Sequence, residues 1–123
     1  MKCLRIPLLL VLAAIGAFAE KKMSAEDFKE ALTGDKIFLL DVRDPNELVE
    51  SGAIEGYINI PLGQLERRMS EVPKNKTVLT LCGHGQRASI AAGMLEKAGY
   101  HVLGSCGIAS WKERGFKTVQ PRH

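Results

Sequence analysis

The residues best suited to chemistry form one stretch in the middle of the chain, TVLTLCGHGQRAS, which begins at Thr77. An apolar run ends on Cys82, a loop with two glycines follows, and the next residues are typical of a helix. Parallel α/β sheets carry their sites at the carboxyl ends of strands, so we expect Cys82 to lie at such a site. Loop amides and the positive end of the helix would stabilise a thiolate, the reactive form of cysteine. The pattern therefore favours a nucleophilic Cys82 over a small buried hydrophobe that ends a strand.

The loop itself is predicted to bind the anion that reacts at Cys82. Gly83 and Gly85 supply backbone angles that other residues adopt poorly, so that successive amides converge on the sulfur. Arg87 is expected near the helix start, where its planar guanidinium either binds an anionic donor or packs into its own loop. His84 either tunes the thiolate or points to solvent. The predicted substrate-binding residues are Gly83, His84, Gly85, Gln86 and Arg87 of the loop, together with Arg43.

Arg43 belongs to this set because it follows another apolar strand, Ile37 to Val42. It should therefore lie on the same edge of the sheet as Cys82, where it contacts substrate or pairs with a neighbouring carboxylate. Asp41, at the end of that strand, is interpreted as an acceptor that anchors a loop rather than as a catalytic base.

Residues 1–19 have the layout of a secretory signal peptide. A short basic start precedes an apolar run of thirteen residues, Ile6 to Phe18, and Ala17-Phe18-Ala19 is an A-x-A cleavage signal. The run is shorter than the ~20 residues that a transmembrane helix needs. We expect cleavage after Ala19, a periplasmic or secreted mature domain of residues 20–123, and no stable membrane anchor. The alternative is an uncleaved anchor.

The composition of the mature part excludes several classes of function. Removing Lys2 and Arg5 from the 17 basic residues leaves 15 against 14 acidic ones, without a basic stripe, so nucleic acid is not an expected partner. The two remaining cysteines are too few for a disulfide scaffold. Cys82, His84, His101 and Cys106 do not have the spacing of a zinc site, so neither a metal nor a cofactor is expected.

Helix and strand patterns alternate along the mature chain. Strands are expected at 37–42, 57–60, 77–81 and 100–103, and helices begin at Ser24, Asp44 and near Arg87, with shorter ones after Pro61 and around Trp111. This alternation predicts an α/β fold of three layers, with a central, mostly parallel sheet flanked by helices on both faces.

The mature chain resembles the single-domain rhodanese-like family, and the exported type in particular. Four segments carry the resemblance: LDVRD from Leu40, GAIEGYINIP from Gly52, CGHGQRAS from Cys82 and GSCGIASW from Gly104. They are similar to the family's first-strand motif, its GHIPGAINIP segment, its CxxGxRS active-site loop and its GG(I/M)xxW segment. The departures are Ala53 in place of histidine, Ala88 before the serine, and Cys106 in place of the first glycine.

The resemblance implies a sulfurtransferase that accepts sulfane sulfur on Cys82 as a persulfide cradled by loop amides. The donor would be a small anion, thiosulfate or polysulfide, and the acceptor cyanide or a thiol, including a thioredoxin-like protein. The alternative is a non-catalytic carrier that delivers the persulfide to a protein partner. Phosphatases of this fold have five residues between cysteine and arginine, whereas this loop has four, so a phosphatase or arsenate-type reductase is disfavoured.

Cys106 is a further candidate because in the family the glycine pair lies against the active-site loop. A thiol near Cys82 could attack its persulfide, release sulfide and form a disulfide that switches activity off. This predicted redox partnership needs Cα atoms within about 7 Å and suitably directed side chains. The alternative is a Cys106 whose sulfur is packed away.

Overall fold

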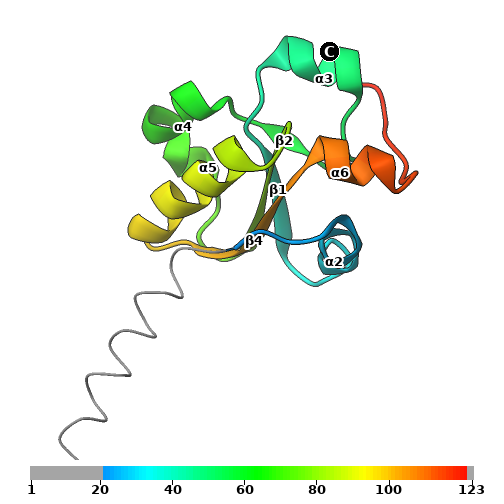
Figure 1. Ribbon diagram of the computed structural model, residues 1–123. Helices are drawn as coiled ribbons and strands as arrows, with labels where there is room; N and C mark the ends of the chain where they lie inside the picture. Colours follow the sequence, from blue (N-terminus) through cyan, green and yellow to red (C-terminus); the bar gives the residue numbers. More distant parts are fainter. Residues whose placement is uncertain (1–20, 122–123) are drawn as a thin grey trace, which may run out of the picture.

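The alternating apolar runs of the sequence form four parallel strands with helices on both faces, as predicted (Figure 1). The structure, a computed structural model, describes residues 21–121. The strands are β1 (Ile37–Asp41), β2 (Ile58–Asn59), β3 (Thr77–Cys82) and β4 (His101–Gly107), in the order β2-β1-β3-β4. Strand β3, which ends on Cys82, is therefore an inner strand between β1 and β4.

Two helices, α2 and α3, begin where capping patterns predict them. The helices are α2 (Ala25–Ala31), α3 (Pro45–Ser51), α4 (Leu62–Arg68), α5 (Gln86–Lys97) and α6 (Ile108–Glu113), with a 3-10 turn η2 (Met69–Glu71). Ser24 caps α2 by accepting a hydrogen bond from the Asp27 amide at 3.1 Å. The Glu47 side chain caps α3 by accepting from the Asp44 amide at 3.0 Å, with Pro45 as first helical residue.

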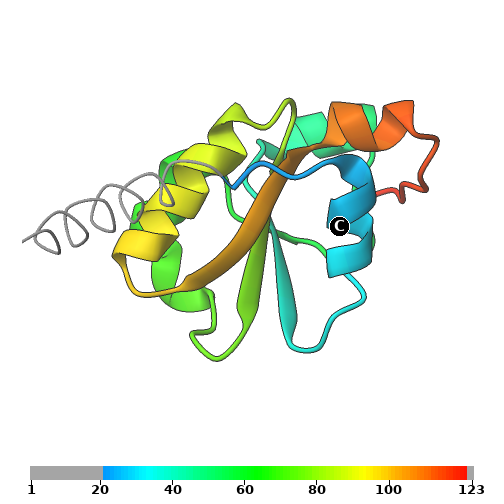
Figure 2. The same ribbon diagram turned by 60° about the horizontal axis from the view of Figure 1, so that its bottom comes forward.

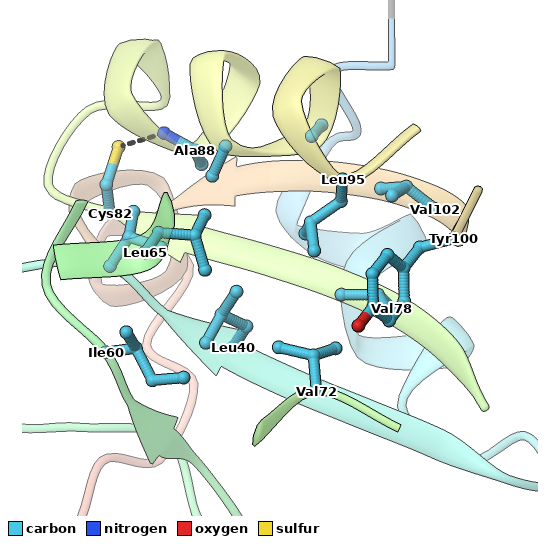
Figure 3. Close-up of a cluster of buried hydrophobic side chains, with 13 residues drawn as sticks. Leu40, Ile60, Leu65, Val72, Val78, Cys82, Ala88, Leu95, Tyr100 and Val102 are labelled. Carbon is cyan, nitrogen blue, oxygen red and sulfur yellow. Dashed lines mark hydrogen bonds between the residues drawn. The ribbon is translucent and has the colours of Figure 1, made fainter. Parts of the chain in front are cut away.

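Each face of the sheet carries its own apolar cluster. Helices α4 and α5 cover one face, where Leu65 and Leu95 pack on Leu40 and Val78 (Figure 3). Helices α2, α3 and α6 cover the other face with side chains that include Phe28, Leu48 and Trp111. Figure 2 shows α5 and α2 on opposite sides of β4. Successive strand residues therefore point into different clusters, and this alternation decides what each side chain at the strand ends can reach.

Strand β4 is longer than the sequence indicates. It was expected to end at Leu103 but continues to Gly107, with an irregular register opposite Val78 and Leu79. The first described residues pair with its outer edge, since the Met23 amide donates to the Ser105 carbonyl and the Ser105 amide to the Lys21 carbonyl, both at 2.8 Å. Because this pairing joins residues far apart in the sequence, the apolar pattern of the strand does not predict it.

The predicted signal peptide lies outside the described residues. Within residues 21–121, none of the helices has the length and apolarity required to cross a bilayer.

Candidate active site

Cys82 occupies the end of β3, and its sulfur accepts two backbone hydrogen bonds. The Gly85 amide donates to Sγ at 3.0 Å and the Ala88 amide at 3.2 Å, the second of which is drawn in Figure 3. The residue is only 1% exposed and also contacts the cluster beneath α5. N–H groups pointing at sulfur stabilise a thiolate or a persulfide anion, so the geometry suits the predicted nucleophile.

The turn between β3 and α5 is fixed at both ends. The Thr80 hydroxyl donates to the Ala88 carbonyl at 2.8 Å and ties the first turn of the helix to the strand. Gly85 has φ +101°, in the left-handed region, as predicted for a tight loop. Within residues 21–121, the amides of Gly83, His84, Gln86 and Arg87 donate to no other group. Four backbone donors therefore stay available for an anion at the start of a twelve-residue helix.

Gly83 plays a different role from the one predicted, because its φ does not lie in the left-handed region. Gly83 lies in close packing instead: a Cβ at this position would come 3.2 Å from Arg87 Nη2, so the Arg87 side chain would have to shift by a few tenths of an ångström. The loop is also pressed against the end of β4: a Cβ at Gly107 would lie 2.8 Å from the Gly83 carbonyl oxygen and from His84. The Ala109 amide of α6 donates to the same Gly83 carbonyl at 3.1 Å and holds the loop in this position.

Arg87 forms a bidentate ion pair with Glu47 of α3. Both nitrogen–oxygen distances are 2.8 Å. The side-chain hydrogen bonds from Arg87 are the main reason that the pKa of Glu47 falls from 4.5 to about 2, and the pKa of Arg87 is raised in turn. In this arrangement Arg87 couples the loop to α3, and its role in binding an anionic donor stays a prediction.

Arg43 is buried and paired with Asp41. The distance from Arg43 Nη2 to Asp41 Oδ2 is 2.7 Å, Nε donates to both carboxylate oxygens, and Nη2 also donates to the Gly52 carbonyl. Within the described chain Nη1 is buried without a hydrogen-bond partner. Pairing with a carboxylate is thus the alternative that the structure supports, and Asp41 is the anchoring acceptor that the sequence predicted.

A pocket of about 520 Å³ lies over the loop. Its walls come from the loop, from the strand end after β1, from α3 and from α6. It is lined by Arg43, Glu47, Ser51, Gly83, His84, Arg87, Ile108, Ala109, Lys112 and Glu113. The predicted loop residues His84 and Gln86 are both exposed, and only His84 of the two lines the pocket.

Cys106 is not placed to be a redox partner of Cys82. It lies within β4 and pairs with Leu81, one residue before Cys82, so the two cysteine side chains point to opposite faces of the sheet. Both cysteines are free, and Cys106 is buried among the side chains beneath α2, α3 and α6. Burial raises the pKa of its thiol. The expected disulfide is therefore wrong for this arrangement, because the sheet itself separates the two sulfur atoms.

The sequence did not single out Glu47, Gly107 or Lys112 as parts of the site. Glu47 was recognised only as a helix-capping residue, although α3 follows β1 directly and must begin at the same edge of the sheet. Gly107 is the last residue of β4, and Lys112 lies in α6, which follows that strand directly. Counting charged residues in the first turn of the helix after each strand could have found Glu47, whereas the contact at Gly107 depends on tertiary packing. Residues 21–121 contain no cluster of three or more potential metal ligands.

Comparison with known proteins identifies the family. The family model for the rhodanese-like domain matches residues 24–114. The chain belongs to the rhodanese-like domain family. A sulfurtransferase from Allochromatium vinosum is 34% identical over 89 residues, which cover 71% of this chain and 82% of that protein. A rhodanese-related protein of Thermoplasma volcanium superposes with a TM-score of 0.74 at 31% identity, covering 82% of this chain and 99% of that structure.

A third relative is much longer than the region that aligns with this chain. YrkF of Bacillus subtilis, named as a candidate sulfur carrier protein, is 35% identical over 80 residues, covering 64% of this chain but only 43% of YrkF. The rhodanese-like fold and family therefore hold for this chain, and its homologues support a role in sulfur transfer.

Proposed function

We propose that the protein is a sulfurtransferase that takes sulfane sulfur from thiosulfate or polysulfide onto Cys82 and passes it to a thiol or to cyanide. The observation that carries the proposal is the Cys82 sulfur itself, which ends an inner strand and accepts hydrogen bonds from the Gly85 and Ala88 amides. No acid–base residue is needed, because the nucleophile is a thiolate and the leaving groups are stable anions.

In the loading step, the Cys82 thiolate attacks the outer sulfur of thiosulfate. A new sulfur–sulfur bond forms, the bond between the outer sulfur and the sulfonate sulfur breaks, and its electron pair leaves with sulfite. Cys82 then carries a persulfide anion. The four loop amides that have no other acceptor within residues 21–121 can donate to this charge as it develops.

A loop held by the Glu47–Arg87 pair and by Ala109 keeps these donors in position before the donor molecule arrives. Preorganised donors stabilise developing charge without the cost of reorganising in the transition state. Arg87 and Arg43 act here as positioning residues, since Arg87 is paired with Glu47 and Arg43 with Asp41, although Nη1 of Arg43 has no partner within residues 21–121.

A non-catalytic persulfide carrier is the second candidate. One observation favours it: the relative YrkF has a name that points to a carrier. A carrier would acquire one sulfur atom on Cys82 and would transfer it only to a protein partner, such as a thioredoxin-like acceptor.

We also propose that the protein acts outside the cytoplasm, in the periplasm or as a secreted protein, after cleavage behind Ala19. The apolar run and the A-x-A signal of the sequence support this proposal. The mass and N-terminal sequence of protein recovered from the native host would test it, and an intact Met1 on the exported protein would contradict it.

Turnover is tested by thiocyanate formation from thiosulfate and cyanide, with Cys82→Ser beside the wild type. We expect the substitution to abolish turnover, because a serine hydroxyl does not form a persulfide. A variant that keeps normal rates would reject Cys82 as the sulfur-accepting residue. Wild type that gains one sulfur atom but transfers it to no small acceptor would favour the carrier.

A further inference from the structure

A second pocket, an apolar groove of about 370 Å³, lies between α3 and β2. It is lined by Pro45, Leu48, Val49, Tyr57, Ile58, Asn59 and Pro121. Leu48 and Tyr57 are buried, whereas Val49 and Ile58 are 58% and 41% exposed. Four large apolar side chains within residues 21–121 are exposed, and two of the four line this groove. Exposed apolar side chains that gather in one groove are typical of an interaction surface.

The groove borders an open edge of the sheet. Strand β2 pairs with β1 alone, and the Ile60 amide donates to the Asp41 carbonyl at 3.1 Å (Figure 1). Because successive residues of a strand bond to opposite sides, the backbone N–H and C=O of Asn59 point away from β1. The Asn59 side chain is held at the end of β1, where it donates to the Asp41 and Arg43 carbonyls, both at 2.8 Å. An extended segment can therefore pair with β2 and lay its side chains in the groove.

The surroundings of the groove carry one sign of charge. Residues 44–59, which supply six of the seven lining residues, contain four acidic side chains and no basic one. One of the four is paired with Arg87, whereas Asp44, Glu50 and Glu55 belong to no ion pair within residues 21–121. This surface attracts a basic partner segment. A second copy of the chain is disfavoured, because contact between two β2 edges would bring the acidic residues of both copies together.

We propose that this groove docks an extended segment of a partner protein, in which apolar side chains alternate with lysine or arginine. The segment would add to the edge of β2 and place its apolar side chains on Val49 and Ile58. Helix α3 forms a wall of both this groove and the active-site pocket, so a partner docked here would lie beside that pocket. The docking itself is independent of the proposed sulfur transfer and is tested without it.

The probe is a fluorescent peptide of alternating lysine and valine, and its binding to the native protein is measured by anisotropy at low ionic strength. A glutamate–valine peptide reverses the charge. The lysine–valine peptide with N-methyl groups on alternate residues lacks the backbone donors of one edge. We expect each of these two changes to weaken binding about tenfold, because charge attraction and main-chain pairing both hold the segment.

Substitutions on the protein locate the docking site. Val49→Ser and Ile58→Ser should each weaken binding of the lysine–valine peptide about fivefold, because each removes apolar surface that the peptide would bury. Glu50→Gln and Glu55→Gln should each weaken it about threefold, the size of effect that exposed ion pairs give, and added salt should reduce this difference. Circular dichroism verifies that each variant is folded.

Matched controls carry the same changes elsewhere on the surface. Ile90 of α5 is 55% exposed but lies outside the groove, so Ile90→Ser should bind the peptide as the wild type does. Glu66 of α4 is exposed, and Glu66→Gln removes one negative charge away from the groove. Cys82→Ser should also bind normally. A protein that docks the peptide but does not load sulfur would reject the proposed function and leave this inference intact.

Three results would overturn the inference. If Val49→Ser and Ile58→Ser bind like the wild type, the groove is not the docking site. If a chain shortened to end at Pro121 binds the peptide about tenfold more tightly, the chain's own last two residues occupy the groove. If sedimentation shows a dimer that Ile58→Ser dissociates, the occupant is a second copy rather than a basic partner.

Discussion

The two cysteines of the described chain lie on neighbouring strands, at nearly the same level of the sheet, and have opposite surroundings. Cys82 ends β3 among backbone N–H donors, while Cys106 pairs with Leu81 and points into the cluster that contains Phe28 and Trp111. Both are almost completely buried. Burial therefore does not distinguish the proposed nucleophile Cys82 from Cys106; the direction of the nearby amides does.

The sheet creates this difference by alternation alone. A shift of one residue along a strand moves a side chain to the other face, so Cys82 meets the start of α5 and Cys106 meets the apolar side chains beneath α2, α3 and α6. Amides stabilise sulfur anions at Cys82, whereas burial raises the pKa of Cys106 and favours its neutral thiol. Substitutions that displace the loop should therefore change the Cys82 thiol and leave the Cys106 thiol unchanged. Labelling both thiols measures this difference.

The largest effect on the Cys82 side is expected from Gly107→Ala. The new methyl group would lie 2.8 Å from the Gly83 carbonyl oxygen and from His84, so the loop must move and its amides no longer converge on the sulfur. We expect sulfur transfer to fall about a hundredfold, as for displacements of about 1 Å in other sites. Thiocyanate formation measures the loss, with circular dichroism to verify the fold.

Gly93→Ala is the matched control, because a Cβ at Gly93 in α5 meets nothing within 4 Å. Alanine is a better helix former than glycine, so this variant should keep full activity and gain up to about 1 kcal/mol in the free energy of unfolding. Equal activities of the two variants would show that contact between β4 and the loop does not shape the site.

A smaller effect, confined to the Cys82 side, is expected from Glu47→Gln. The ion pair with Arg87 is partly exposed to solvent, so we expect a loss of about 1 kcal/mol in the free energy of unfolding at pH 7. The pKa of Glu47 is lowered from 4.5 to about 2, so its contribution is complete above pH 4.5 and disappears as the pH falls toward 2.

Urea unfolding of wild type and Glu47→Gln at pH 7, 4.5 and 2.5 measures this contribution. The stability difference should shrink steadily at the lower pH values, and a difference that is independent of pH would contradict the ion-pair account. Alkylation at Cys82 should change in Glu47→Gln while alkylation at Cys106 does not. Glu71→Gln, which breaks the surface pair with Arg68, should leave both thiols unaffected.

The sequence predicted the parts of the molecule that depend on local pattern. The caps at Ser24 and Asp44, the parallel strands and the position of Cys82 at a strand end all follow from periodicity and turn chemistry. It did not predict the Glu47–Arg87 pair, which joins residues forty positions apart. The Cys106 prediction failed because a short strand was assumed to end at Leu103, which left the face of residue 106 undetermined.

The most direct test of the account locates the sulfur atom on the protein. Native protein is exposed to thiosulfate and, separately, to polysulfide, and the peptides that contain Cys82 and Cys106 are weighed by mass spectrometry. The account predicts one added sulfur on Cys82 and none on Cys106, the same loading in Cys106→Ala, and no loading in Cys82→Ser. Sulfur found on Cys106 of the native protein, or on Cys82→Ser, would contradict it.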